Sequence, residues 1–228
     1  MFLSKLTIDV RSREFRRDYA DIHQMHRTVM SAFPDVPGDT AYRQNHGVLW
    51  RIDPSNNGFL CYVQSRTQPN WSSLPTGYLM HPAETRSLQL VLDTIRSGRK
   101  LAFRLVGNPT RVIHPDGTPG ARGRGKRVPH RRPDKQIEWL VRKGEQHGFV
   151  IPTAADGKPD VAPSPCPTST GTKQGDKPAR ITVEPVRFDG HLIVTDNDAF
   201  TEAVTTGIGR AKAYGCGLIS LASARNHP

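Results

Sequence analysis

A glycine-rich run near the end of the chain constrains the fold most. Residues 207–222 read GIGRAKAYGCGLISLA, with four glycines around two cations. A loop of this kind that opens a nucleotide-binding βαβ unit needs a crossover helix and a further strand after it. Eleven residues follow Gly217, too few for both, and Lys212 stands where the third glycine of a dinucleotide fingerprint belongs. We therefore expect no cofactor loop of that class, and GLISLA predicts a closing strand.

The same run is a candidate binding loop. Glycines let a backbone approach a bulky group closely, and two cations in one loop favour a group that carries phosphate. The alternative is an ordinary glycine-rich turn before an edge strand. The candidate binding residues are Gly207, Gly209, Arg210, Lys212, Gly215 and Gly217.

The chain is strongly basic. Among 228 residues, 32 Lys and Arg outnumber 21 Asp and Glu, which gives a formal net charge of +11 and a pI near 10. A chain of this length can bury a sizeable core as one large or two small domains. A field of this sign attracts polyanions, so nucleic acid is the first candidate partner and an anionic membrane surface the second.

Much of this charge lies in the run RGRGKRVPHRR at 122–132, which contains no acidic residue. Its glycines and Pro129 predict a loop or hairpin rather than a helix. Mobile arginines suit a folded RNA, because its phosphates line a deep groove in which side chains cannot easily read the bases. The alternative is a solvated basic loop. The candidate RNA-binding residues here are Arg122, Arg124, Lys126, Arg127, Arg131 and Arg132.

Two features indicate where the protein works. No stretch approaches the roughly eighteen apolar residues of a membrane span, and the opening MFLSKLTIDV lacks the apolar run of a signal peptide. Cys61, Cys166 and Cys216 lie far apart and form neither a CxxC pair nor a disulfide framework. This pattern is typical of a reducing cytosol, so we expect a cytoplasmic protein with no membrane partner.

The first half of the chain alternates strand and helix patterns. Residues 2–10 alternate apolar and polar side chains, as a half-buried strand does. Residues 16–32 predict one helix, whereas 47–53 and 58–65 predict a hairpin. Residues 84–97 fit a helix or a strand equally well. The helix residues expected to face the core are Tyr19, Ile22, Met25, Val29 and Ala32.

The second half repeats the alternation with an insertion. We expect a strand at 100–109 and a helix at 134–147. Residues 152–179 include six prolines among many polar residues and predict a mobile or disordered insert. Residues 179–190 and 191–196 predict paired strands. The helix residues expected to face inward are Ile137, Leu140 and Val141.

The last helix should run from a cap at Asp196 or Asp198 to about Thr206, before the closing strand. Each half then approximates β-α-β-β-α-β, the split βαβ arrangement. The sequence therefore predicts an α+β protein with one such domain at 1–96 and a second at 97–228.

The helix expected at 16–32 carries candidate chemistry. His23 and His26 share one face of it and are followed by Arg27. Two imidazoles beside a guanidinium can move protons to and from a phosphodiester while the cation stabilises charge on phosphate oxygens. The alternatives are a metal site, for which no further ligand has suitable spacing, and two surface histidines. We expect His26 and His23 to be catalytic and Arg27 to bind RNA.

The sequence shows no cluster of carboxylates with the spacing of a two-metal nuclease. We therefore expect cleavage without a metal or any other cofactor. Such chemistry favours RNA as the substrate, because the 2′-hydroxyl of RNA can attack the adjacent phosphate and DNA has no such group.

Several blocks in this order resemble the CasE family, the CRISPR repeat-processing endoribonucleases of type I-E Cascade. The similarity covers most of the chain, and the G-x-G-x5-G-x-G form of the final block is shared by the wider repeat-processing superfamily. The blocks are FLSKL at the start, MHRTV at 25–29, PNWSSLPTGY at 69–78, LAFRLVGNPTR at 101–111, GKRV at 125–128, the IEWL helix, VRFDGHLIV at 186–194 and GIGRAKAYGCGLISLA.

The resemblance implies two tandem ferredoxin-like (RRM-like) domains with a strand near 85–93. It also implies metal-independent cleavage of CRISPR repeat RNA at the base of a stem-loop, leaving a 2′,3′-cyclic phosphate. The enzyme would then stay bound to the mature guide RNA among the other Cascade subunits. The family's catalytic histidine falls on His26. This chain departs from the family at His23, where a tyrosine is frequent, and at Ser31, where some members carry a lysine.

Two other functions stay open from the sequence. A catalytically silent RNA-binding module of the same fold is kept open by the departure at His23. A basic ribosomal or assembly protein would explain the charge, but not the face formed by two histidines and an arginine.

Overall fold

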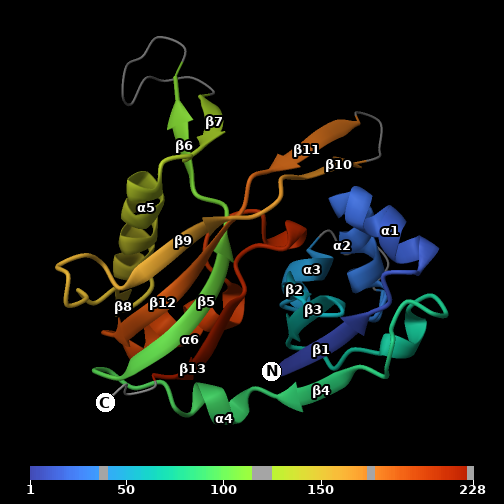
Figure 1. Ribbon diagram of the computed structural model, residues 1–228. Helices are drawn as coiled ribbons and strands as arrows, with labels where there is room; N and C mark the ends of the chain where they lie inside the picture. Colours follow the sequence, from blue (N-terminus) through green and yellow to red (C-terminus); the bar gives the residue numbers. More distant parts are fainter. Residues whose placement is uncertain (36–40, 115–124, 174–177, 225–228) are drawn as a thin grey trace.

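The first half of the protein is built on a four-stranded antiparallel sheet (Figure 1). The computed structural model describes residues 1–35, 41–114, 125–173 and 178–224. The strands of this sheet are β1 Phe2–Ile8, β2 Leu49–Ser55, β3 Gly58–Ser65 and β4 Glu84–Ser87. The helical segments are α1 Arg13–Ala20, α2 Ile22–Met30, α3 Tyr42–Asn45 and the 3-10 turn η1 Trp71–Ser73. The strand order is β2-β3-β1-β4, so β1 lies between the third and fourth strands.

The second half is built on a sheet of five strands and two long helices. The elements of this unit are β5 Lys100–Gly107, α5 Pro133–Gln146, β8 Phe149–Val150, β9 Val161–Pro165, β12 Val186–Val194, α6 Asn197–Thr206 and β13 Ile219–Ser223. Their order is β13-β5-β12-β8, and β9 also pairs with β12. Two hairpins project from this half (Figure 1). Their strands are β6 Thr110–Ile113 with β7 Lys126–Pro129, and β10 Ser169–Lys173 with β11 Ala179–Val183.

Both halves place their first strand between their third and fourth strands, which is the order of the ferredoxin-like fold. The second half has both helices of that fold. In the first half, η1 and its loop stand where the second helix would be. The expected fold class is confirmed: the protein is α+β, with two tandem ferredoxin-like units.

The connection between the two sheets runs from β4 to β5. It contains a four-residue helix, α4 Gln89–Leu92. The expected boundary at 96/97 falls in this connection and stays a prediction. Ile95, just before it, is buried in the core of the second half. Residues 84–97 thus form a short strand and a short helix, and the strand implied near 85–93 extends only to Ser87.

The helix expected at 16–32 is wrong as one element, because it breaks at Asp21. The Oδ1 atom of Asp21 accepts a hydrogen bond from the backbone N–H of His23 at 2.9 Å and so caps α2. Aspartate is a preferred N-cap because its carboxylate satisfies N–H groups of the first turn. The break turns Tyr19 outward, leaving it 47% exposed. The other residues expected to face inward are buried: Ile22, Met25, Val29 and Ala32.

The expected hairpin of 47–53 with 58–65 is confirmed as β2 and β3, joined by a two-residue turn. The expected helix at 134–147 is confirmed as α5. Leu140 of this helix is buried together with Trp139, whereas Ile137 and Val141 are only partly buried.

The segment 152–179, expected to be mobile, is ordered into strands over much of its described part. β9 carries Pro163 and Pro165, yet it pairs along β12. Proline is tolerated there because β9 has only one neighbouring strand and needs fewer N–H donors. β10 consists of small and polar residues, and it pairs with β11, which carries the apolar residues Ile181 and Val183. Composition predicted disorder because it takes no account of these tertiary partners.

The expected pairing of 179–190 with 191–196 is wrong, since β12 runs without a turn through Asp189, Gly190 and His191. Gly190 serves a close approach instead of a turn. A Cβ atom at this position would collide with the backbone oxygen of Asp160 on the neighbouring segment. Glycine is needed here because a neighbouring segment comes close to the backbone. The local sequence pattern looks the same for such a contact as for a bend.

Buried hydrogen bonds join the two halves through β2. The guanidinium of Arg51, 3% exposed, is paired with Asp53 at 2.8 Å. Its other nitrogens donate to the backbone oxygen of Leu218 at 3.4 Å and to the hydroxyl of Ser220 at 3.0 Å. The indole N–H of Trp50 donates to the backbone oxygen of Ala213 at 3.2 Å. These bonds fix the glycine-rich loop and β13 against the first sheet.

We predict that Arg51→Met lowers the free energy of unfolding by about 3 kcal/mol, near the low end for breaking a buried ion pair. Asp53 would keep only its longer pair with Arg104 at 3.6 Å. The backbone oxygen of Leu218 and the hydroxyl of Ser220 would lose their donor. Urea unfolding at pH 7 would measure the change. Lys5→Met, which breaks the exposed pair between Lys5 and Glu84, should leave stability nearly unchanged. Equal losses in the two variants would contradict a structural role for Arg51.

Candidate functional site

Helix α2 presents the two candidate catalytic histidines on one side. Met25 and Val29 face the core of the first half. This orientation leaves His23 and His26 half-buried and Arg27 exposed. The two imidazole rings lie 6.5 Å apart between centroids. The structure therefore brings these three residues together as the sequence predicts.

The glycine-rich loop returns to α2 from the far end of the chain. Its 3-10 turn, η2 Lys212–Tyr214, contacts α2 and β2. The ring of Tyr214 meets that of His26 edge to face, with centroids 6.2 Å apart. Gly215 follows with a φ of +77°, and a Cβ atom there would lie 3.2 Å from the Trp50 ring. Only glycine combines this backbone conformation with so close a contact.

His26 lies in an environment that favours its neutral form. Burial lowers its pKa from 6.5 to about 4, and the positive charges of His23 and Arg43 act in the same direction. The Nδ1 atoms of His23 and His26 are buried and have no hydrogen-bond partner among the described residues. Unpaired buried polar atoms are costly and concentrate where function requires them. A neutral imidazole in this position can accept a proton near pH 7.

Strand β10 packs against the start of α2 (Figure 1). A Cβ atom on Gly171 would lie 2.5 Å from Oδ1 of Asp21 and 3.0 Å from the backbone nitrogen of His23. Ile181, which pairs with Gly171 across the hairpin, packs on the core of the first half. The hairpin of β10 and β11 thus holds the capped end of the helix that carries both histidines.

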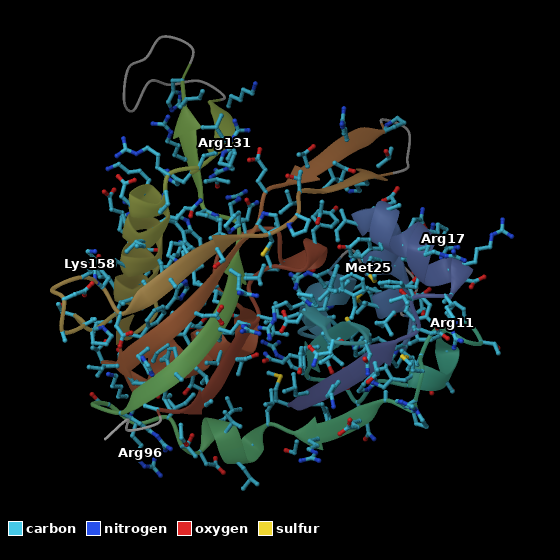
Figure 2. All side chains as sticks on the ribbon, in the orientation of Figure 1. Arg11, Arg17, Met25, Arg96, Arg131 and Lys158 are labelled. Carbon is cyan, nitrogen blue, oxygen red and sulfur yellow. The ribbon has the colours of Figure 1, made fainter. Side chains whose placement is uncertain are left out.

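The sequence-predicted cations fall into two groups. Arg131 pairs with Glu184 at 3.1 Å, and Arg132 pairs with Asp134 at 2.9 Å. Arg131 lies at the base of the hairpin of β6 and β7 (Figure 2). Lys126 of β7 lines a neighbouring hollow with Arg131. Arg122 and Arg124 lie outside the described residues.

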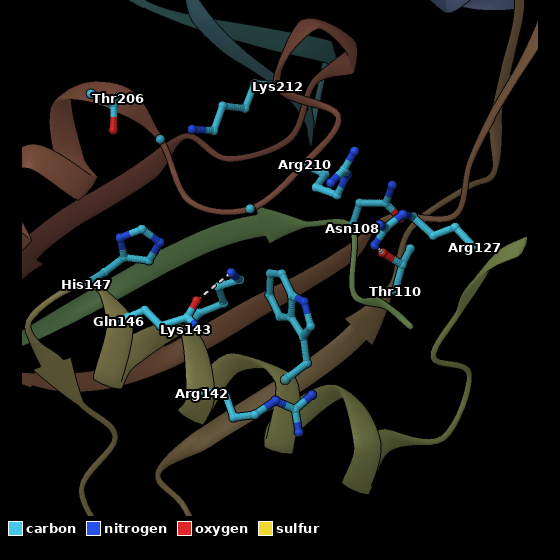
Figure 3. A pocket seen from close by; sticks show the side chains of 13 residues that line it. Asn108, Thr110, Arg127, Arg142, Lys143, Gln146, His147, Thr206, Arg210 and Lys212 are labelled. Carbon is cyan, nitrogen blue, oxygen red and sulfur yellow. Dashed lines mark hydrogen bonds between the residues drawn. The ribbon is translucent and has the colours of Figure 1, made fainter. Parts of the chain in front are cut away.

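The second group surrounds a pocket next to the glycine-rich loop (Figure 3). Arg127 of β7 lines it together with Arg210 and Lys212 of the loop. Gly207 and Gly209 form part of the same wall. The structure therefore joins the glycine-rich loop to one residue of the basic run, although the two lie far apart in sequence.

Sequence reasoning missed several side chains near these groups. Arg43 of α3 is close enough to lower the pKa values of both His26 and Lys212. Arg142 and Lys143 project from the polar face of α5, a face that the helical pattern predicts without indicating its neighbours. The residues missed in this way are Arg43, Arg142, Lys143, His147 and Tyr214.

The described part of the chain offers neither a metal-binding cluster nor a membrane-spanning helix. No three His, Cys, Asp or Glu side chains within it are placed to hold a metal ion. None of its helices has the length and apolar character needed to cross a membrane.

We predict that His26 makes the protein less stable as the pH falls from about 6.5 to about 4. Its pKa is lower in the folded state, so the unfolded chain binds more protons in this window. Urea unfolding of wild type and His26→Gln across this range should give curves that diverge, with the wild type losing more stability toward low pH. Parallel curves would show that burial of His26 does not favour its neutral form.

Comparisons with known proteins show the family to which the chain belongs. Residues 1–223 match the family model described as CRISPR associated protein. The chain is 30% identical to the CRISPR-associated endoribonuclease Cse3 of Thermus thermophilus, over 97% of this chain and 100% of that protein. It is 31% identical to the CRISPR system Cascade subunit CasE of Escherichia coli K12, over 97% and 99%. A structure of T. thermophilus Cse3 bound to an RNA representing a pre-cleavage complex has a TM-score of 0.74 at 29% identity, covering 97% of this chain and 98% of that one. The chain therefore belongs to this family of CRISPR-associated proteins.

Proposed function

We propose that this protein is an endoribonuclease that cleaves CRISPR precursor RNA at the base of the repeat stem-loop. It then stays bound to the mature guide RNA as a subunit of Cascade. The contact between His26 and Tyr214 carries the proposal, because it places a neutral imidazole against a glycine-rich loop with nearby cations. The nearly full-length similarity to proteins named endoribonuclease and Cascade subunit supports the substrate class and the partner.

The chemistry follows from the two imidazoles. His26 takes the proton of the 2′-hydroxyl upstream of the scissile phosphate as the 2′-oxygen bonds to phosphorus. Its Nε2 atom fits this role, since Nδ1 is buried. The bond from phosphorus to the 5′-oxygen breaks, and His23 supplies the proton that this oxygen takes. The products are a 2′,3′-cyclic phosphate and a free 5′-hydroxyl, because the 2′-oxygen is the nucleophile and the 5′-oxygen is the leaving group, and the two imidazoles only move the protons.

Charge on the phosphate oxygens needs fixed donors. Arg27 is exposed on α2 directly after His26, and we assign it to the phosphate at the reaction centre. Backbone N–H groups of the glycine-rich loop are suited to the same task, because preorganised donors need no reorganisation during the reaction.

The protein acts without a metal or other cofactor in this proposal, and it works in the cytoplasm. Cys61, Cys166 and Cys216 are all free. Burial raises the pKa values of Cys61 and Cys216 to about 12, which keeps both as thiols. Free, unreactive thiols suit a reducing compartment.

We predict that His26→Ala slows cleavage of a labelled repeat RNA by about 10²–10⁴-fold, the usual contribution of a general acid–base group. Affinity for the RNA should change little. Single-turnover rates at saturating protein and Kd values would be measured in parallel. The control is His81→Ala, which removes an exposed histidine near β4. A large loss of affinity in His26→Ala would make His26 a binding residue instead.

The same assay tests the nucleophile. Once the cleavage site of the wild-type protein has been mapped, the ribose upstream of it is replaced by deoxyribose. Cleavage should stop while binding stays intact, and EDTA should have no effect on the unmodified RNA. Cleavage of the substituted RNA, or a requirement for a divalent ion, would overturn this mechanism. Tight binding with no cleavage of any repeat RNA would favour the silent RNA-binding module.

We predict that Gly171→Val slows cleavage by roughly 10–10²-fold, because a side chain there must displace Asp21 and the start of α2. The Kd for RNA should change by a much smaller factor than the cleavage rate, and the midpoint of thermal unfolding should stay close to that of the wild type. Thr172→Val is the matched control, since Thr172 is the next residue of β10 and is exposed. Equal cleavage rates in the two variants would show that the hairpin does not position the histidines.

A further inference from the structure

A pocket of about 480 Å³ lies between α5 and the glycine-rich loop, apart from the two histidines of α2. Lys143 and His147 approach it from α5, and Arg210 and Lys212 approach it from the loop (Figure 3). The positively charged or titratable side chains of its lining are Arg127, Arg142, Lys143, His147, Arg210 and Lys212. No carboxylate lines it in the part of the chain that the structure describes.

The five permanently basic residues of this pocket lack anionic partners within the described parts of the chain. Lys143 donates to the side-chain oxygen of Gln146 at 2.7 Å, and Arg127 donates to the hydroxyl of Thr110 at 3.4 Å. Both partners are neutral. Burial lowers the pKa of Lys212, and the charges of Arg43 and Lys143 add to this effect. Like charges held this close repel one another, and a bound anion would relieve the repulsion.

The contrast with the neighbouring arginines is sharp. Arg131 and Arg132 are charges of the same kind, yet each forms a two-point hydrogen-bonded pair with an acidic residue. An RNA phosphate would have to compete with Glu184 for Arg131 and with Asp134 for Arg132. Among the described residues the pocket cations have no such competitor, so they have more to gain from a phosphate.

The lining also indicates which part of an RNA would bind. Trp139 contributes to the wall but is only 6% exposed, so it offers no free ring face for base stacking. The remaining polar groups are amides and hydroxyls, which bind phosphate and sugar oxygens readily. The lining therefore favours the sugar–phosphate backbone over a base.

The pocket is electrostatically continuous with the histidines. Arg43 lowers the pKa of His26 on one side and that of Lys212 on the other. Lys212 in turn lowers the pKa of His147 at the end of α5. Positive groups thus extend from the histidine pair to the far wall of the pocket, so one RNA strand that follows them meets both sites.

We propose that this pocket binds consecutive phosphates of the RNA backbone, on a part of the strand away from the scissile phosphate. The proposal rests on the proposed function in taking RNA as the ligand. Arg142 and Lys143 of α5 are the residues it adds to the RNA-binding surface, and they anchor the backbone without contacting the reacting atoms.

The test is the salt dependence of RNA binding. The double variant Arg142→Gln with Lys143→Gln is made in a His26→Ala background, which keeps the repeat RNA intact, and Kd is measured over a series of NaCl concentrations. The slope of log Kd against log salt should fall by about 1.4, because each phosphate that the protein neutralises on a single strand contributes about 0.7 to it. Circular dichroism would verify the fold of each variant.

Two comparison variants remove the same amount of charge elsewhere. Arg86→Gln with Arg96→Gln removes exposed charges on β4 and just after α4, which do not line the pocket, and should leave the slope nearly unchanged (Arg96 is labelled in Figure 2). Arg131→Gln with Arg132→Gln should reduce the slope less than the α5 pair, because these arginines are already paired. An α5 variant with the slope of the Arg86 and Arg96 variant overturns the proposal.

The proposal and the proposed function fail separately. Normal cleavage by the wild-type chain, with an unchanged slope in the α5 variant, removes the pocket alone. A reduced slope in the α5 variant, with no cleavage by the wild-type chain, keeps the pocket as an RNA-backbone site and removes the endoribonuclease.

Discussion

The buried guanidinium of Arg51 holds the two halves of the protein in the relation that the site requires. It bonds to Asp53 in its own strand. It also donates to the backbone oxygen of Leu218, just before β13, and to the hydroxyl of Ser220 in β13. Leu218 directly follows the last glycine of the glycine-rich loop, so the bond from Arg51 fixes the end of that loop. Trp50 fixes the loop itself, because its indole N–H donates to the backbone oxygen of Ala213. Since Tyr214 meets His26 from this loop, the geometry at the histidine depends on a bond network formed within the domain interface.

Local periodicity was sufficient to predict the elements that carry the fold. The alternation in β1, the hairpin of β2 and β3, and the amphipathic pattern of α5 each reflect burial of one face, which is a property of the segment itself. The pairing of His23 with His26 was predictable for the same reason, because helical spacing alone puts them on one face. That the glycine-rich loop meets this face depends on the packing of two domains, and no local pattern contains it.

Two of the three expectations that failed here depend on tertiary partners, and the third depends on a helix cap. Asp21 ends one helix and caps the next, although the apolar spacing continues across it. Gly190 looks like a turn, but it makes room for a neighbouring strand. The basic run at 122–132 contains no acidic residue, yet Arg131 forms an ion pair with Glu184, which is distant in sequence. For Gly190 and Arg131 the deciding partner lies on another element, so composition and spacing misjudge the residue. The cap at Asp21 is a local signal, because its carboxylate bonds to the N–H of His23 two residues on, and the continuing apolar spacing hides it.

The electrostatics of the site give the order in which its parts act. In the free protein, burial and the charges of His23 and Arg43 keep His26 neutral, which prepares it to accept a proton. The same environment would resist the imidazolium that forms when it does. A bound phosphodiester brings negative charge to this positive region and offsets that resistance, because a nearby opposite charge favours the protonated form. In the proposed reaction, the substrate therefore completes the base that acts on it, and His26 holds a proton stably only when RNA occupies the site.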